Sequence, residues 1–195
     1  MSQRLLRRYE DGERMNHWFI ALMFVLAGLS GLAFFHPSLF FLSHLFGGGS
    51  WARILHPFLG LLMVLAFLIL FARLWRDNLV TAADREWKKH AGRMLRGDKA
   101  GMPPAGKYNY AQKMVFWAMA VSLLVLLVTG IMFWRPWFAP YFSIGMMRVA
   151  VLLHSVAAVV LVAATIMHVY APIWVKGTVR AMSRGTVTES WAQAN

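Results

Sequence analysis

Four long runs without a charged residue dominate this chain of 195 residues. An α-helix needs about 20 apolar residues to cross roughly 30 Å of hydrocarbon, and each run is close to that length or longer. A chain spans a bilayer only as α-helices or as a closed β-barrel, because every backbone N–H and C=O group there must be hydrogen-bonded within the protein. No strand candidate occurs in the chain, so the runs predict a bundle of helices. The uncharged runs cover residues 15–35, 54–72, 114–134 and 149–175.

The runs define one membrane domain over residues 1–195, and the first run is too long and lacks the cleavage site for a removable signal. We therefore expect an all-α integral membrane four-helix bundle. Its predicted helices cover residues 15–36, 52–75, 111–134 and 148–175. A loop at 76–110 and a short tail at 176–195 complete it, and residues 84–96 of the loop could form a surface helix.

Positive charge is distributed unequally between the two sides of this bundle. Of the 20 Lys and Arg residues, 17 lie in segments 1–14, 73–113 and 176–195, whereas Arg53, Arg135 and Arg148 lie on the other side. Positively charged loops stay in the cytoplasm, so both termini and the long loop are predicted to be cytoplasmic. The net charge of +12 is therefore a topology signal, and no nucleic-acid partner is expected.

Four of the seven histidines lie in or beside the predicted spans, where an ionisable side chain is costly unless it is paired or ligated. His154 and His168 share one face of the last helix and are separated by about 21 Å along its axis. Depth in the membrane then pairs His56 with His154 near the periplasmic face and His17 with His168 near the cytoplasmic face. His36, His44 and His90 fall in loops, where solvated side chains are expected.

Two imidazoles per site, with no further ligand nearby, suit the axial positions of a planar macrocycle better than a four-ligand zinc site. The sequence has no cysteine, which excludes thioether attachment and thiolate iron–sulfur ligation. The pattern thus favours two noncovalent b-type haems with His17, His56, His154 and His168 as iron ligands. An interfacial role for a single histidine remains the alternative. Small residues that would admit a macrocycle, or equally close helix packing, are Gly28, Gly31, Gly60, Ala157, Ala158, Ala163 and Ala164.

Polar groups precede the third helix on the cytoplasmic side. Asn109 and Gln112 could hydrogen-bond the carbonyls of a quinone head group near the His17/His168 pair. An ordinary helix cap with Asn109 at the N-cap explains the same residues equally well.

Several motifs in order along the chain resemble the gamma subunit of respiratory formate dehydrogenases, a membrane cytochrome b. They are ERMNHW at 13–18, RILHPF at 53–58, GKYNYAQKMVFW at 106–117, LLVTGIMFWRP at 126–136, His154, His168 and WVKG at 174–177. Members of that family carry a longer charged tail after the last helix, and they often have glycine where this chain has Ala111.

The resemblance implies two haems b, held by the His56/His154 and His17/His168 pairs. It also implies a menaquinone or ubiquinone site formed by Asn109, Ala111, Gln112 and His168. The expected partners are an iron–sulfur beta subunit and a molybdenum or tungsten alpha subunit that itself oxidises formate, with membrane lipid around the chain and a trimer of heterotrimers as the assembly. The cytochrome b of a hydrogenase or thiosulfate reductase is a close alternative. A non-redox membrane anchor or a small transporter with proton-carrying histidines is an alternative of another class.

Overall fold

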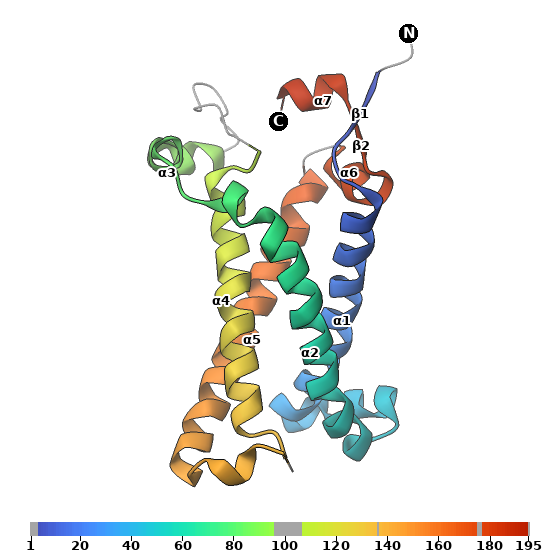
Figure 1. The fold of residues 1–195 in the computed structure, drawn as a ribbon, viewed down its shortest axis with the longest axis vertical. Coiled ribbons are helices and arrows are strands. Elements are labelled where there is room, and N and C mark those ends of the chain that lie inside the picture. Colours follow the sequence, from blue (N-terminus) through green and yellow to red (C-terminus); the bar gives the residue numbers. More distant parts are fainter. Residues whose placement is uncertain (1–3, 96–106, 136, 175–176, 195) are drawn as a thin grey trace.

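The computed structural model describes residues 4–95, 107–135, 137–174 and 177–194, and it is an upright bundle of four long helices with smaller elements at both ends (Figure 1). The four long helices are α1 (Asp11–Phe35), α2 (Gly49–Leu74), α4 (Tyr110–Met132) and α5 (Ile144–Trp174). The shorter elements are β1 (Leu5–Arg7), η1 (Pro37–Phe46), η2 (Arg76–Asn78), α3 (Ala82–Leu95), η3 (Ala139–Tyr141), α6 (Thr178–Arg184), β2 (Thr186–Thr188) and α7 (Glu189–Ala194). We call the end with β1, β2 and α3 the terminal end, and the end with η1 and η3 the loop end.

The four long helices are each apolar enough and long enough to cross a membrane, which confirms the predicted membrane helix bundle. The first begins at Asp11 rather than at residue 15, because Glu10 and Glu13 form a capping box at its start. The last begins at Ile144 rather than at residue 148. Both helices therefore begin before the uncharged run that predicts each of them.

The bundle consists of two helical hairpins, since α1 packs mainly against α2 and α4 mainly against α5. A buried cluster at mid-height joins the hairpins, and Met23, Phe67 and Leu161 are among its members. Leu161 lies seven residues from both His154 and His168 on α5. The apolar core thus separates a layer at the terminal end from a layer at the loop end.

Two short antiparallel strands at the terminal end correct the expectation that the chain has no strand. Leu6 of β1 lies opposite Val187 of β2, and Gly185, with φ 75°, turns the chain from α6 into β2. The Arg8 amide donates to the Gly185 carbonyl over 2.8 Å. Strands of three residues carry too little alternation to be seen in a sequence, and their pairing requires the bundle to bring the two chain ends together.

The surface helix predicted at 84–96 is present as α3, and an ion pair fixes it to the bundle. Asp84 on α3 lies 2.7 Å from the Nζ of Lys113 on α4, and both side chains are 7% exposed. Thr81 donates two further hydrogen bonds to Asp84. Trp87 is buried beside Tyr110. The side chain of His90 and loop residues 96–106 lie outside the described part of the chain.

At the loop end, α2 begins at Gly49, earlier than the expected residue 52. Gly47 and Gly48 have φ values of 85° and 100°, which other residues rarely adopt, and they let the chain reverse directly into α2 at Gly49. Pro57 therefore lies inside the helix, although proline favours the first turn, and His56 is two turns from the helix start.

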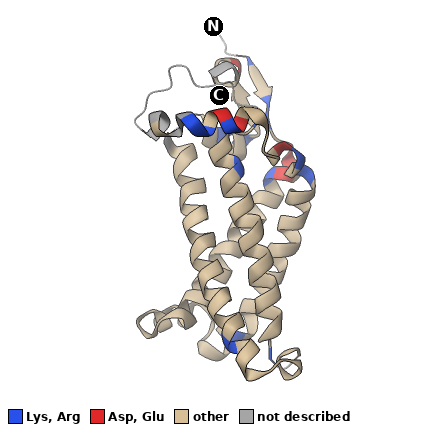
Figure 2. Ribbon diagram, turned by 90° about the vertical axis from the view of Figure 1, so that its left-hand side faces the viewer, with Lys and Arg blue, Asp and Glu red and all other residues tan. Residues whose placement is uncertain are grey.

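Charged residues gather at the terminal end, whereas the long helices are almost free of them (Figure 2). The described part of the chain at this end contains α3, β1 and the start of α1, all of which carry Lys or Arg. This distribution matches the asymmetry seen in the sequence.

Candidate functional site

Two pairs of histidine rings bridge the two hairpins. His17 of α1 faces His168 of α5 with 5.9 Å between ring centres, towards the terminal end. His56 of α2 faces His154 of α5 with 6.3 Å between ring centres, towards the loop end. The structure therefore brings together the same two pairs that depth in the sequence predicts.

The spacing within each pair suits a metal ion between the rings. Two metal–imidazole bonds of about 2.0 Å each, plus a ring radius of roughly 1 Å on both sides, separate ring centres by about 6 Å. The described residues contain no cluster of three His, Asp or Glu side chains that could complete a tetrahedral site. Each pair can thus supply two axial ligands and leaves the equatorial positions to a macrocycle.

The loop-end rings have hydroxyl partners on the neighbouring helix of their own hairpin. Nδ1 of His56 lies 2.9 Å from Oγ of Ser30, and Nδ1 of His154 lies 2.9 Å from Oγ1 of Thr129. In both rings the other nitrogen, Nε2, is left for a ligand. Neither hydroxyl was identified from the sequence, although Ser30-Gly31 and Thr129-Gly130 form a repeated hydroxyl–glycine dipeptide that could have signalled them.

Glycines provide the space that the loop-end rings occupy. A Cβ on Gly31 would lie 3.1 Å from Cε1 of His56, and a Cβ on Gly130 would lie 3.3 Å from Cε1 of His154. A Cβ on Gly28 or on Gly60 would meet no atom of the described residues within 4 Å, so the helix surface at both positions is open to a neighbouring group. These residues fit a flat group between the hairpins.

The terminal-end pair is less constrained by polar contacts. Nδ1 of His17 is buried without a hydrogen-bond partner in the described part of the chain. The residue before it, Asn16, instead donates to the Ala66 carbonyl over 3.0 Å and ties α1 to α2. The ring of His17 contacts Trp18 edge to face. An orphaned ring nitrogen in a buried layer is consistent with a site that binds a further group.

The polar segment before α4 forms a helix cap. The Asn109 side-chain oxygen accepts from the Gln112 amide over 3.0 Å, and the Gln112 side-chain oxygen accepts from the Asn109 amide over 2.9 Å. Ala111 and Gln112 are exposed at the terminal end. Among the described residues, the hydrogen bonds of Asn109 and Gln112 stay within the cap and do not involve His168. The structure therefore brings this segment to the same end as the His17/His168 pair without bringing it into the pair.

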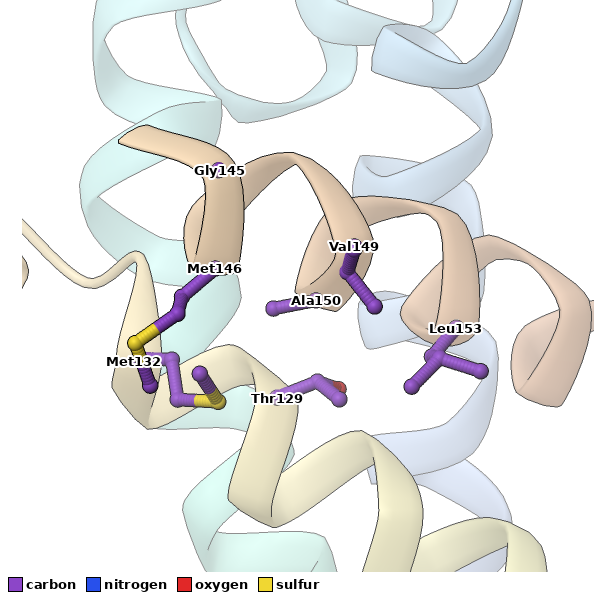
Figure 3. A pocket seen from close by; sticks show the side chains of 7 residues that line it. All are labelled: Thr129, Met132, Gly145, Met146, Val149, Ala150 and Leu153. Atoms are coloured by element: carbon purple, nitrogen blue, oxygen red, sulfur yellow. The ribbon is translucent and has the colours of Figure 1, made fainter. Parts of the chain in front are cut away.

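An apolar pocket of about 410 Å³ lies between α4 and α5 at the loop end (Figure 3). Met132 and Met146 lie together at one end of the pocket and Leu153 at the other. Thr129 contributes a hydroxyl to its lining. None of the four paired histidines lines the pocket, but it shares Thr129 with the loop-end pair, because Oγ1 of that residue lies 2.9 Å from Nδ1 of His154.

Four membrane-length helices with paired imidazoles in two layers are the architecture of a membrane cytochrome b. The chain belongs to the family described as prokaryotic cytochrome b561, whose model matches residues 8–185, and haem b is accordingly its cofactor. It is a multi-pass protein of the bacterial inner membrane that acts in electron transfer.

The chain is similar to cytochrome b556 subunits of formate dehydrogenases. It is 46% identical to the cytochrome b556(fdo) subunit of Escherichia coli K12 over 186 residues, which is 95% of this chain and 87% of the relative. Identity to the cytochrome b556 subunit of Haemophilus influenzae is 39%, over 95% of this chain and 78% of the relative. Identity to the nitrate-inducible cytochrome b556(Fdn) subunit of E. coli K12 is 38%, over 98% and 88%. The resemblance expected from the motifs is confirmed.

Proposed function

We propose that this chain is the membrane cytochrome b subunit of a formate dehydrogenase and carries electrons through two haems b to quinone. The observation that carries the proposal is the presence of two facing imidazole pairs in separate layers, 5.9 and 6.3 Å between ring centres. The similarity to formate dehydrogenase subunits supports the choice of enzyme.

His56 and His154 would hold the loop-end haem, and His17 and His168 the terminal-end haem. When bound, each haem supplies reversible one-electron transfer. The chain's own contribution is to hold both imidazoles of each pair on different hairpins, so that the packing of the hairpins sets the ring spacing. The apolar core around Leu161 separates the two layers.

Charge asymmetry supports a cytoplasmic terminal end and a periplasmic loop end. In that orientation an iron–sulfur subunit and a molybdenum or tungsten catalytic subunit would dock at the loop end, and the complex would be a trimer of heterotrimers. Each electron that crosses against a potential of 100 mV conserves roughly 2.3 kcal/mol, so the separation of the layers across the membrane is what conserves energy.

Quinone would bind beside the terminal-end layer, with Asn109, Ala111, Gln112 and His168 around its head group. The capping box engages the side-chain oxygens of Asn109 and Gln112, and within the described residues both side-chain NH₂ groups are free to donate to quinone carbonyls. Burial, together with a hydrogen bond to Tyr9, raises the pKa of Tyr108 above its usual range. That phenol therefore stays protonated at neutral pH.

The test is a reduced-minus-oxidised spectrum of the purified complex with a haem-to-protein ratio. Two b-type haems per chain support the proposal, and His168→Ala should then remove one haem and abolish quinone reduction. Formate oxidation with an artificial electron acceptor should persist in that variant. Retention of both haems in His168→Ala would contradict the ligand assignment, and copurification with hydrogenase subunits would contradict the choice of enzyme.

Substitutions that preserve the helix cap test the quinone site. Asn109→Asp and Gln112→Glu keep the capping oxygens and remove the NH₂ donors. If these donors bind quinone, the KM for quinone should rise while the haem content stays unchanged. A wild-type KM in both variants would exclude the two amides from the site.

A further inference from the structure

Each loop-end ring is held by a hydroxyl–glycine dipeptide. Ser30-Gly31 on α1 contacts His56 on α2, and Thr129-Gly130 on α4 contacts His154 on α5. In each hairpin the dipeptide lies on the first helix and the histidine that it contacts lies on the second. The described part of the chain shows no corresponding hydroxyl contact to His17 or His168.

The other hydrogen bonds of the two hydroxyls indicate the direction of both contacts. Oγ1 of Thr129 donates its one hydrogen to a backbone carbonyl of its own helix, with the Val125 oxygen 2.6 Å away. Oγ of Ser30 does the same towards the carbonyls of Leu26 and Ala27, 2.9 and 3.0 Å away. A hydroxyl that gives its one hydrogen to a carbonyl acts towards the ring as an acceptor, and we infer that Nδ1–H of each ring is the donor. Nε2 then carries the lone pair and is the nitrogen free to ligate a metal.

The glycine of each dipeptide limits where the ring can lie. The ring edge of His56 comes so close to Gly31 that a Cβ would stand 3.1 Å from Cε1, and Gly130 approaches His154 in the same way. Ser30 is fully buried, and Thr129 is 4% exposed, so water does not compete for either hydrogen bond. The hydroxyl sets the rotation of the ring and the glycine sets its closest approach.

Building on the proposed function, we propose that Ser30-Gly31 and Thr129-Gly130 are positioning residues that orient His56 and His154 for the loop-end haem and lower its reduction potential. An imidazole that donates from Nδ1–H is a more basic ligand, and it stabilises the oxidised iron. In the described part of the chain no hydroxyl contacts the terminal-end pair in this way, and Nδ1 of His17 is buried without a partner. The two hydroxyls therefore favour electron flow from the loop end towards the terminal end.

The experiment is a redox titration of the full complex with Ser30→Ala, Thr129→Val and the double variant, followed by optical and electron paramagnetic resonance spectra. The loop-end haem is identified as the one lost in His56→Ala. Its potential should rise in each single variant and rise further in the double variant, and its low-spin signals should broaden as the rings lose their fixed rotation. Haem affinity at this site should fall about 10-fold. The terminal-end haem should be unchanged.

Matched controls distinguish loss of the hydroxyl–ring contact from loss of any hydroxyl on these helices. Ser155 and Thr165 on α5 donate to carbonyls of their own helix, so Ser155→Ala and Thr165→Val should leave both potentials unchanged. Thr129→Ser keeps the acceptor and should restore the potential that Thr129→Val changes.

Three results would overturn the inference. Unchanged potentials and signals in the double variant, with both haems present, would overturn it alone and leave the proposed function intact. An equal shift in the control variants would also overturn it. Fewer than two haems in the unsubstituted complex would overturn the proposed function, and the inference with it.

Discussion

The two ends of the bundle hold their histidine pairs in different ways. At the loop end, hydroxyls and glycines contact the rings of His56 and His154 directly. At the terminal end, Trp18 contacts the ring of His17 edge to face, and the polar stabilising contacts lie around the pair. The β1–β2 ladder joins the chain ends, and the Lys113–Asp84 ion pair docks α3. Arg14 donates to the carbonyls of Met182 and Ser183.

This difference teaches that the same ligand pair can be built by two strategies. Direct contacts fix ring rotation and tune the ligand, whereas peripheral contacts fix the helices and leave the rings free to adapt. The proposed quinone site adjoins the terminal-end layer, and freedom of the rings there would accommodate the small movements that substrate binding requires. The following predictions test whether the two ends are as independent as these contacts indicate.

The largest effect is expected from loss of a ligand. His154→Ala and His168→Ala should each remove one haem, because each leaves one imidazole where two are needed. The haem content measured against protein should fall to about half in either variant. Loss of both haems from one substitution would show that the two layers are coupled, contrary to the separation by the apolar core.

The next effect is expected at the terminal end, from breaking its buried ion pair. Lys113→Met leaves Asp84 buried without its cation, at a cost of about 3–5 kcal/mol to the docking of α3. Limited proteolysis of residues 82–95 should become faster. The control is Lys89→Met on α3 itself, where the exposed pair with Glu86 is worth about 0–1 kcal/mol. The loop-end haem spectrum should be unchanged in both variants, and a shift in it would contradict the independence of the ends.

A smaller effect is expected from adding a methyl group at the glycine that contacts His56. Gly31→Ala places a methyl group 3.1 Å from the ring of His56 and should weaken binding of the loop-end haem by about 10-fold. Gly12→Ala on the same helix meets no atom within 4 Å and should have no effect. Haem loss during dilution, followed by absorbance, measures the difference. Equal haem retention in the two variants would show that Gly31 does not constrain the ring.

The smallest effect is a pH dependence confined to the terminal end. Burial opposes ionisation of Asp84, but the hydrogen bonds from Lys113 and Thr81 outweigh it and hold its pKa below the usual value of 3.8. Because the pKa of Asp84 is lower when α3 is docked, the ionised carboxylate stabilises docking at pH values above 3.8. This stabilisation is lost as the pH falls through the lowered pKa. The protection factors of the α3 amides, which are hydrogen-exchange rates corrected for the intrinsic effect of pH, should therefore be constant from pH 7 to about pH 5 and should fall below about pH 4. A fall in protection already near pH 6 would contradict this account of Asp84.

The sequence predicted the membrane helices well because hydropathy alone decides them. It also predicted which histidines meet, since four rigid spans leave each residue only one depth. The helix α2 begins before the predicted residue 52, because the positive φ values of Gly47 and Gly48 admit a turn that hydropathy does not reveal. Asn109 and Gln112 were correctly recognised as a possible cap, and their hydrogen bonds are those of a cap. Their role towards quinone stays a prediction.

By itself, the sequence determined the membrane bundle, the unequal charge of its two ends and the depth of each histidine. These properties depend on apolar length, charge and helical rise, which are local and add along the chain. Only the tertiary structure decided that Ser30 and Thr129 reach the ring nitrogens, that Gly31 and Gly130 make room for the rings, and that residues 5–7 pair with residues 186–188. Such contacts depend on how one helix is rotated against another, which packing alone fixes.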